Sequence, residues 1–283
     1  MRWSDAAEVA IAGASRYILE AGDETWDVQV WVPDESAREG REVPALYVVD
    51  PLATFATTLT TVDVLNKLSA GVMGPTAVVG VAPTGDFMYN HPKRFRDMTP
   101  TSAAAEVHVA VATHGMGQAD AFLALIVEEI APFVERRHGL QPAGRGIGGW
   151  SLGGLLTCHA LLTRHGDFDR YLAVSPSLWW DSELLVARAK ELSAGSLAGK
   201  HLYMGTGELE NDLDRMWPPP PPEVRAMIEG QLADADMCGS ARRFAEALEV
   251  DSGARVRQEI IAGEHHVTVW GAAMTRGLIE LYG

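Results

Sequence analysis

The sequence predicts an α/β fold in which a mainly parallel sheet carries helices on both faces. Short β-branched, apolar runs alternate along the chain with longer amphipathic stretches, a pattern typical of repeated strand–helix–strand units. The chain has 283 residues, 47% of them hydrophobic and 22% charged, which is ordinary globular composition. Sheet domains of this class often reach this length, so we expect a single domain over residues 1–283.

Strands and helices alternate regularly in this prediction. Residues 27–33 alternate apolar and polar side chains, as a half-exposed strand does, whereas residues 45–50 and 76–82 are continuously apolar, as strands buried on both faces are. Further strands are expected at residues 145–150, 171–175, 201–204 and 256–262. Helices are expected at residues 55–68, 119–137, 152–165, 182–192, 241–249 and 269–282.

Two stretches do not fit this alternation. Residues 84–116 are long and irregular, and residues 207–231 contain five consecutive prolines at positions 218–222. Proline cannot continue a helix or a central strand, so the second stretch is predicted to be an extended loop or lid. Long loops in a compact α/β domain are more often functional than not, and we predict that both are active-site loops.

Charge and cysteine content limit the classes of partner. The formal net charge is −15 and the isoelectric point is about 5.0, so the chain would repel nucleic acid and anionic membranes. The two cysteines are too few for a disulfide framework, and no segment has the composition of a secretory signal or a membrane span. We expect a cytoplasmic protein with a small-molecule partner, and the sequence leaves its oligomeric state open.

The segment Gly149-Trp150-Ser151-Leu152-Gly153 matches the G-x-S-x-G pattern of a nucleophile elbow. In an elbow the serine lies on a tight strand-to-helix turn, and the two glycines prevent steric clashes inside that turn. The serine hydroxyl is exposed above the sheet, and the N-terminus of the next helix favours negative charge on the attacked carbonyl. A predicted strand precedes the motif and a predicted helix follows it, so we predict that Ser151 is a catalytic nucleophile.

The general base is predicted from the order of residues along the chain. In folds that use this elbow the order is serine, then acid, then histidine, on successive strand ends. His265 and His266 follow the last predicted strand and precede the last predicted helix. His201 begins a strand, which is the wrong end of the sheet, and His159 and His165 lie on the helix after the elbow. The base is therefore His265 or His266, and spacing alone does not decide between them.

The acid that orients the base should follow the strand at residues 201–204. Glu208 is the acidic residue nearest to the end of this strand, and it is our prediction for this role. The alternatives on the same loop are Glu210, Asp212 and Asp214.

Two backbone N–H groups are expected to form an oxyanion hole. Leu152 directly follows the serine and supplies the first. The second is expected from the loop after residues 45–50, where Pro51 has no N–H and Leu52 is the nearest residue that has one.

Side chains on the predicted loops are candidates for substrate binding. Arg94 and Arg96 are predicted to clamp an acidic group, with ion pairs to Asp97 or Asp86 as an equally good explanation of both arginines. The tryptophans Trp179, Trp180 and Trp217, together with Met216, Phe87 and Tyr89, are predicted to line an apolar or aromatic pocket. The spacing of histidine, cysteine and acidic residues fits no metal site, so we expect neither a metal nor a cofactor.

Five segments have residue patterns of one enzyme family. They are residues 45–50 (Ala-Leu-Tyr-Val-Val-Asp), 94–100 (Arg-Phe-Arg-Asp-Met-Thr-Pro), 118–126, 175–180 (Ser-Pro-Ser-Leu-Trp-Trp) and 263–269 (Gly-Glu-His-His-Val-Thr-Val). From about residue 27 to its end, the chain resembles the putative-esterase branch of the α/β hydrolases, which includes enterochelin (siderophore) esterases and related trilactone hydrolases. The resemblance implies the α/β-hydrolase fold and ester hydrolysis by a serine.

The resemblance also bears on single residues. The family's Glu-x-His-x-Ser pattern aligns with residues 264–268, which implies that His266 is the base. Some members of the branch work with a serine–histidine pair alone, so the acid stays open. The chain has Asp50-Pro51 where the family has Asp-Gly, which alters the oxyanion loop, and the prolines at 218–222 are not a family feature.

The predicted function is that of a serine hydrolase that cleaves a carboxylic ester or lactone through an acyl-enzyme. The aromatic loops favour a bulky aromatic or macrocyclic substrate, such as a siderophore or another natural product. An acyltransferase on the same fold and a non-catalytic binding protein are the alternatives. Ser151 and two candidate histidines argue against the binding protein, whereas hydrolase and transferase differ only in an acceptor channel that the sequence does not show.

Overall fold

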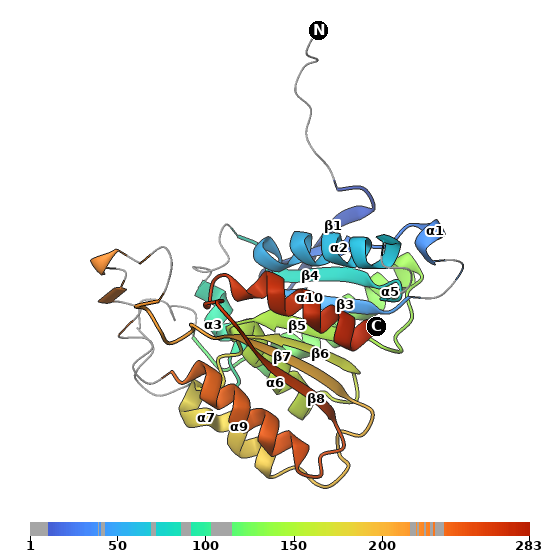
Figure 1. Ribbon diagram of the computed structural model, residues 1–283. Helices are drawn as coiled ribbons and strands as arrows, with labels where there is room; N and C mark the ends of the chain where they lie inside the picture. Colours follow the sequence, from blue (N-terminus) through green and yellow to red (C-terminus); the bar gives the residue numbers. More distant parts are fainter. Residues whose placement is uncertain are drawn as a thin grey trace.

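The computed structural model describes residues 11–38, 40, 43–68, 72–85, 92–102, 115–215, 219, 221–223, 225–226, 229 and 235–283. Its centre is an eight-stranded sheet in the order β1-β2-β4-β3-β5-β6-β7-β8 (Figure 1). The strands are β1 (Ala14–Ala21), β2 (Glu24–Trp31), β3 (Ala45–Val49), β4 (Ala77–Pro83), β5 (Gly146–Trp150), β6 (Arg170–Val174), β7 (His201–Gly207) and β8 (Arg255–Ile261). The helices are α1 (Glu35–Arg38), α2 (Pro51–Leu68), α3 (Pro92–Met98), α4 (Ala119–Ala124), the π-helical η1 (Leu125–Ile130), α5 (Ala131–His138), α6 (Leu152–Thr163), α7 (Trp180–Lys190), α9 (Met237–Glu249) and α10 (Val269–Tyr282).

The directions of the strands confirm the mainly parallel sheet. Strands β3 to β8 are parallel to one another, and β2 is antiparallel to both of its neighbours, β1 and β4. All five residues of β3 are buried, as its continuously apolar sequence predicts. This sheet with its covering helices is the predicted α/β-hydrolase fold.

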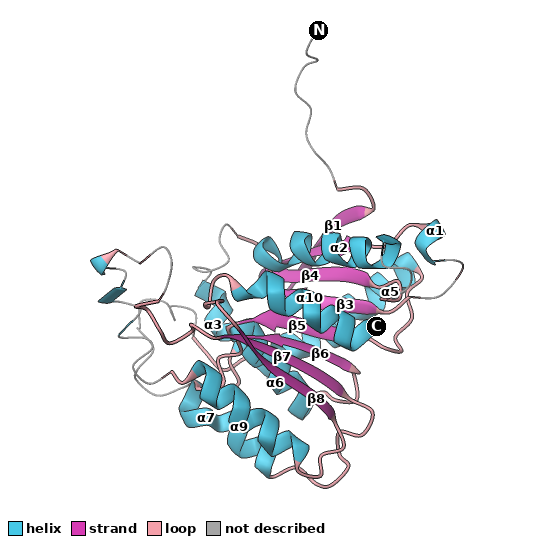
Figure 2. Ribbon diagram, viewed as in Figure 1, coloured by secondary structure: helices cyan, strands magenta, loops and turns pink. Residues whose placement is uncertain are grey.

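Helices cover both faces of the sheet (Figure 2), and a hydrophobic layer lies beneath them on each face. On one face α2 and α10 bury side chains such as Phe55 and Met274 against β3 to β7. On the other face the helices from α4 to α7, together with α9, bury side chains such as Phe122, Leu156 and Phe244. The strands are thus held between helices, and their carboxyl ends are left for loops that carry polar residues.

Several elements differ from the sequence prediction, among them the short helices α1 and α3, which were not predicted. Strand β1 was not predicted, because its side chains are exposed or half-buried throughout and its sequence lacks an apolar run. The helix predicted at residues 119–137 is instead a succession of α4, η1 and α5, with a π-helical turn before Pro132. Proline has no N–H to donate and its ring clashes with the carbonyl four residues earlier, which accounts for a widened turn at this point.

The two predicted active-site loops are described only in part. Within residues 84–116 the chain forms α3, and Gly117 N–H donates to Thr99 Oγ1 at 2.8 Å, which joins the end of α3 to the start of α4. In Figure 1, α3 lies beside the ends of the strands that lead into the loops. Phe87, Tyr89, Met216 and Trp217 lie outside the described residues.

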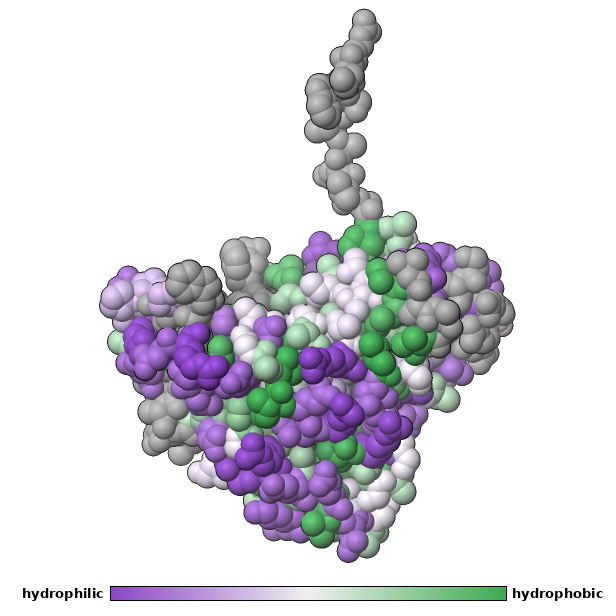
Figure 3. All heavy atoms as spheres, in the orientation of Figure 1, coloured by the Kyte–Doolittle hydropathy of each residue, from purple (hydrophilic) through white to green (hydrophobic). Residues whose placement is uncertain are grey.

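The surface agrees with the charged composition. On the face shown in Figure 3, hydrophilic side chains predominate, and the hydrophobic ones form separate groups. In the described part of the chain, no helix combines the length and the apolar composition that crossing a bilayer requires.

Candidate active site

The predicted nucleophile lies on a strained turn between β5 and α6. Ser151 has φ 61° and ψ −117°, a combination that non-glycine residues rarely adopt. A Cβ atom on Gly149 would lie 2.6 Å from the carbonyl carbon of Gly153, and one on Gly153 would lie 2.7 Å from Val49 Cγ2. Gly149 therefore lets the turn close, and Gly153 lets the start of α6 approach the end of β3.

Hydrogen bonds from neighbouring segments hold the backbone of Ser151. Its N–H donates to the carbonyl of Val174 at 3.0 Å, and its carbonyl accepts from the N–H groups of Leu155 and Ser177, at 2.9 and 3.1 Å. Strain at a single residue persists only where the surroundings determine its conformation in this way. The elbow is thus attached both to α6 and to the turn after β6.

His266 lies next to the elbow, in the connection between β8 and α10. Its ring centroid is 5.1 Å from that of Trp150, the residue before Ser151. Its Nδ1 is 2.6 Å from Glu210 Oε2. An ionised carboxylate only accepts hydrogen bonds, so Nδ1 carries the proton and Nε2 of the neutral ring is left unprotonated, the form that a general base requires.

The structure separates the two adjacent histidines that sequence spacing did not distinguish. His265 is buried, and its backbone forms the turn that begins α10: its N–H donates to Thr268 Oγ1 at 3.1 Å, and its carbonyl accepts from Val269 N–H at 3.1 Å. The contacts with Glu210 and Trp150 belong to His266. The position expected of a base is therefore that of His266.

Glu210 is the acidic residue that contacts His266. Its side chain is 0% exposed, and its Oε1 accepts a 3.0 Å bond from Gly207 N–H and another from the hydroxyl of Ser175. Burial raises the pKa of Glu210, but the hydrogen bonds from His266, Ser175 and Gly207 outweigh burial and leave the pKa below its ordinary value. The Glu210 carboxyl group is therefore ionised and fixed in orientation.

The prediction of Glu208 as this acid does not agree with the geometry. Glu208 is exposed, and its carboxylate bonds to Arg215 at 3.2 Å and to Gly263 N–H at 2.9 Å. Asp212 and Asp214 bond to Arg215 N–H and to Arg225 respectively. Strand β7 runs to Gly207, and the following turn directs Glu208 outwards and Glu210 inwards. Distance along the chain from the strand end could not reveal these directions.

The two predicted oxyanion donors both begin helices. Leu152 is the first residue of α6, and Leu52 is the second residue of α2 and is 66% exposed. Backbone N–H groups in the first turn of a helix have no intrahelical acceptor and carry part of the positive end of the helix dipole. Because α2 follows β3, α6 follows β5 and these strands are paired, the two helix ends lie near each other.

The structure places both predicted substrate-clamping arginines in ion pairs. Arg94 is buried, and its Nη2 is 2.9 Å from Asp50 Oδ2. Arg96 bonds to Asp97 at 2.6 Å and to Glu24 at 2.9 Å. Their guanidinium groups are therefore engaged within the protein, and the clamp prediction is corrected for both.

The predicted aromatic pocket is also revised. Trp180 is 1% exposed and its indole N–H donates to Thr101 Oγ1 at 3.3 Å, so it belongs to the core. Trp179 is half-buried, with its ring 6.0 Å from that of Trp180, and Trp217 lies outside the described residues. Trp180 is buried by tertiary contacts, among them those with Thr101 and Phe95, which residue type alone could not indicate.

A hollow of about 830 Å³ lies beside the loop that carries Glu210. Its lining residues are Glu208, Asn211, Asp212, Leu213, Asp214, Arg225, Glu229, Ala235, Asp236 and Cys238. Ser151 and His266 are not among them, so this hollow is not the place where chemistry at the serine would occur. Within the described ranges, no group of three or more histidine, cysteine or acidic side chains is arranged to hold a metal ion.

Comparison with known proteins finds siderophore esterases among the relatives of this chain. The siderophore triacetylfusarinine C esterase of Aspergillus fumigatus is 35% identical over 159 residues, which are 55% of this chain and 52% of that protein. The siderophore enterobactin esterase of Emericella nidulans is 32% identical over 191 residues, 62% of this chain and 58% of that protein. The matched region therefore spans only somewhat more than half the length of each relative.

Structural similarity extends over nearly the whole chain. The siderophore hydrolase EstB of Aspergillus nidulans superimposes with a TM-score of 0.82 and 26% identity, covering 98% of this chain and 97% of that one. The profile of the family described as "Putative esterase" matches residues 20–281. The chain belongs to this esterase family.

Proposed function

We propose that the protein is a serine esterase or lactonase that hydrolyses a carboxylic ester through an acyl-enzyme. Ser151 is the nucleophile, His266 the general base and Glu210 the acid that orients the base. The observation that carries this proposal is the 2.6 Å contact of a fully buried glutamate with Nδ1 of His266, beside a serine on a strained elbow. A nucleophile, a base and an orienting group are the parts that nucleophilic catalysis requires.

The reaction follows from these positions. His266 Nε2 takes the proton of the Ser151 hydroxyl as Oγ attacks the ester carbonyl carbon, and the N–H groups of Leu152 and Leu52 hold the resulting oxyanion. The carbon–oxygen bond to the alcohol then breaks, and the alcohol leaves with the proton from His266. Water repeats the sequence on the acyl-enzyme, which releases the acid and restores Ser151.

Glu210 contributes by remaining ionised. A negative charge beside Nδ1 favours the tautomer that leaves Nε2 free and stabilises the imidazolium that forms during the attack. The low pKa of Glu210, maintained by donors that outweigh its burial, keeps this charge in place at neutral pH.

The nucleophile is tested by covalent labelling. An aryl phosphonate or a sulfonyl fluoride should modify Ser151 and abolish esterase activity, and peptide mass spectrometry identifies the modified residue. The variant Ser151→Ala serves as the control, because it should be neither labelled nor active. Full activity in Ser151→Ala would refute the proposed function.

The names of two relatives, a triacetylfusarinine C esterase and an enterobactin esterase, support a substrate class. We therefore propose a bulky siderophore-type ester or macrolactone for this chain. Its kcat/KM should exceed that for p-nitrophenyl acetate by at least tenfold, about 1.4 kcal/mol of transition-state binding. Measuring kcat/KM for p-nitrophenyl esters, a catecholate trilactone and triacetylfusarinine C tests this prediction. Activity confined to the acetate would remove the siderophore proposal and leave a general esterase.

A further inference from the structure

The buried side chain of Arg94 connects two segments next to the proposed oxyanion hole. Its Nε lies 3.0 Å from each carboxylate oxygen of Asp50, and its Nη2 donates to the carbonyl of Trp150 at 3.3 Å. The side chains of Arg94 and Asp50 are only 8% and 5% exposed. One guanidinium group from α3 thus contacts both the end of β3 and the end of β5.

These contacts lie beyond the point where the sheet itself aligns the two strands. The pairing of β3 with β5 joins Leu46 to Gly146, Tyr47 to Ile147 and Val48 to Gly148. Asp50 and Trp150 lie two residues beyond the last of these pairs: Asp50 directly follows β3, and Trp150 is the last residue of β5. Arg94 therefore provides a cross-connection where the strands diverge into their loops.

Both segments continue directly into the proposed oxyanion donors. Asp50 precedes Pro51 and Leu52, and Trp150 precedes Ser151 and Leu152. Asp50 has φ 57°, so it resembles Ser151 in having a backbone conformation that its surroundings must hold in place. The bidentate contact with a planar guanidinium is a strong geometric restraint on this carboxylate.

The segments also pack closely against each other. A Cβ atom on Gly153 would lie 2.7 Å from Val49 Cγ2 and 3.6 Å from Asp50 Oδ2, so the start of α6 approaches the end of β3 without room to spare. Small displacements of Asp50 would therefore change the separation of Leu52 N–H from Leu152 N–H. An oxyanion hole depends on that separation, because donors act only within hydrogen-bond distance of the developing charge.

We propose that Arg94 is a positioning residue that sets the spacing of the two oxyanion donors by clamping Asp50 to the carbonyl of Trp150. This inference rests on the proposed esterase function. Arg94 is buried and acts through Asp50 and Trp150, not through contact with the substrate. Its loss should therefore lower kcat more than it raises KM, because the donors bind the oxyanion more strongly than the ground-state carbonyl.

A purely structural ion pair would behave differently, and a double variant distinguishes the two roles. Arg94→Met leaves Asp50 as an unpaired buried charge and should lower Tm. Arg94→Met with Asp50→Asn removes that charge and should recover much of the Tm. If Arg94 positions the donors, kcat of the double variant stays at least tenfold below wild type with KM within about twofold. If the pair is only structural, kcat recovers together with Tm, and the inference fails.

The buried pair of Arg145 and Glu135 provides a matched control. Arg145 lies before β5, at the opposite end of that strand, and it binds Glu135 through two bonds of 2.8 and 2.9 Å. The double variant Arg145→Met with Glu135→Gln makes the same chemical change away from the site. Its kcat should equal that of wild type at a temperature where both are folded, and an equal loss of kcat in both double variants would overturn the inference.

A second variant keeps the test decisive where the double variant fails to fold. Arg94→Lys retains the positive charge opposite Asp50 but lacks the planar fork that reaches Asp50 and Trp150 together. We expect a Tm close to wild type and a kcat at least tenfold lower, whereas a wild-type kcat would overturn the inference. Phosphonate labelling of Ser151 in the wild type separates the two proposals: its absence refutes the esterase itself, and its presence with unaffected Arg94 variants refutes only the role of Arg94.

Discussion

Two histidine–glutamate pairs in this protein have similar contacts and very different surroundings. His266 Nδ1 lies 2.6 Å from Glu210, and His201 Nε2 lies 3.1 Å from Glu280. Each pair joins a ring nitrogen of a histidine to a glutamate carboxylate. The first lies at the carboxyl ends of β7 and β8, beside Ser151, whereas the second lies at the first residue of β7.

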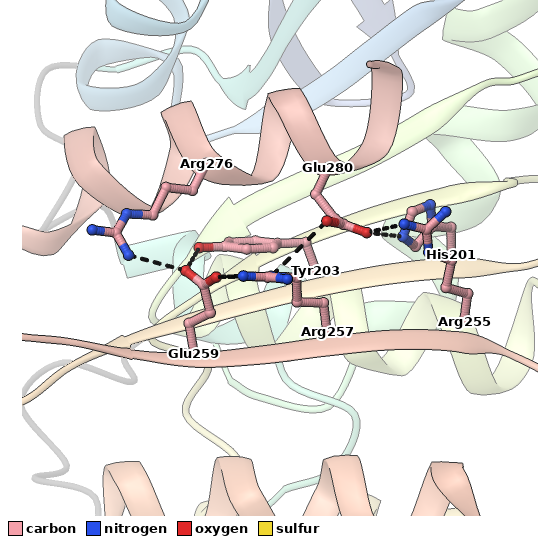
Figure 4. Close-up of polar contacts among 7 residues, drawn as sticks. All are labelled: His201, Tyr203, Arg255, Arg257, Glu259, Arg276 and Glu280. Carbon is pink, nitrogen blue, oxygen red and sulfur yellow. Dashed lines mark hydrogen bonds and ion pairs between the residues drawn. The ribbon is translucent and has the colours of Figure 1, made fainter.

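The carboxylate of the second pair is shared with arginines. Figure 4 shows Glu280 with His201 and Arg255 on one side and Arg257 on the other, and Arg255 Nη2 lies 2.5 Å from the same oxygen that contacts His201. The neighbouring Glu259 is bound in turn by Arg276 at 3.2 Å and by the Tyr203 hydroxyl at 3.0 Å. The charge of Glu280 is therefore balanced by guanidinium groups and is not reserved for a histidine.

Glu210 has a different set of partners. Apart from His266, its recorded donors in the described part of the chain are uncharged: the Ser175 hydroxyl and the Gly207 N–H. Its negative charge extends to the half-buried Cys238, whose pKa is raised to about 11 by burial and then by Glu210. The comparison teaches that the two contacts differ in their surroundings: among the described residues no recorded cation competes with His266 for Glu210, whereas arginines share Glu280 with His201, and this difference supports a catalytic role for the first pair only.

The largest expected difference between the two pairs is the effect on kcat of replacing each histidine. His266→Ala should lower kcat by about 10³-fold or more, because the serine loses its base. His201→Ala should leave kcat within about twofold, since its pair lies at the other end of β7. Steady-state kinetics with a p-nitrophenyl ester measure both. His265→Ala is the neighbouring control, and a larger loss there than in His266→Ala would show that the base has been assigned to the wrong residue.

Replacing Glu210 should also lower kcat more than replacing Glu280, but by a smaller factor than the one that separates the two histidines. Glu210→Gln keeps the shape of the side chain but loses the charge that fixes the tautomer, and kcat should fall by about 10²–10⁴-fold. Glu280→Gln should keep nearly full activity. Glu208→Gln tests the acid predicted from sequence, and we expect less than about a threefold change because Glu208 bonds to Arg215 at the surface. A thermal melt of each variant shows whether a loss of kcat reflects unfolding. A loss of kcat in folded Glu208→Gln larger than that in Glu210→Gln would contradict the assignment of the acid.

The sequence predicted the parts of this molecule that local patterns determine. The apolar runs of β3 and β4 and the strand–Ser151–helix motif led to the correct sheet class and elbow position. Other features depend on tertiary contacts that no local pattern encodes. The turn after Gly207 exchanges the expected roles of Glu208 and Glu210, and Arg94 turns towards Asp50, a residue 44 positions away.

The smallest expected effect concerns stability and separates the two pairs by pH. The folded pKa of Glu210 lies below 4.5, because the bonds from His266, Ser175 and Gly207 outweigh the raising effect of burial. The folded pKa of His201 lies below 6.5, because burial and the charge of Arg255 outweigh the bond to Glu280. Both shifts mean that the unfolded chain binds more protons than the folded one, so stability rises with pH in both cases.

The pH windows of the two effects differ. The contribution of Glu210 is complete above its unfolded pKa of 4.5 and is lost as the pH falls through the lower folded value, whereas that of His201 falls as the pH drops below 6.5. Urea unfolding of wild type, Glu210→Gln and His201→Asn between about pH 3.5 and 7.5 measures how each residue changes the free energy of unfolding. The stability of wild type relative to Glu210→Gln should fall as the pH drops below about 4.5, and its stability relative to His201→Asn should fall as the pH drops from about 6.5 to about 5. Because each variant is compared with wild type, the contributions of the other buried histidines to the pH dependence of stability cancel. If the stability of His201→Asn runs parallel to that of wild type between about pH 5 and 6.5, the bond to Glu280 offsets the burial of His201 and the prediction is wrong.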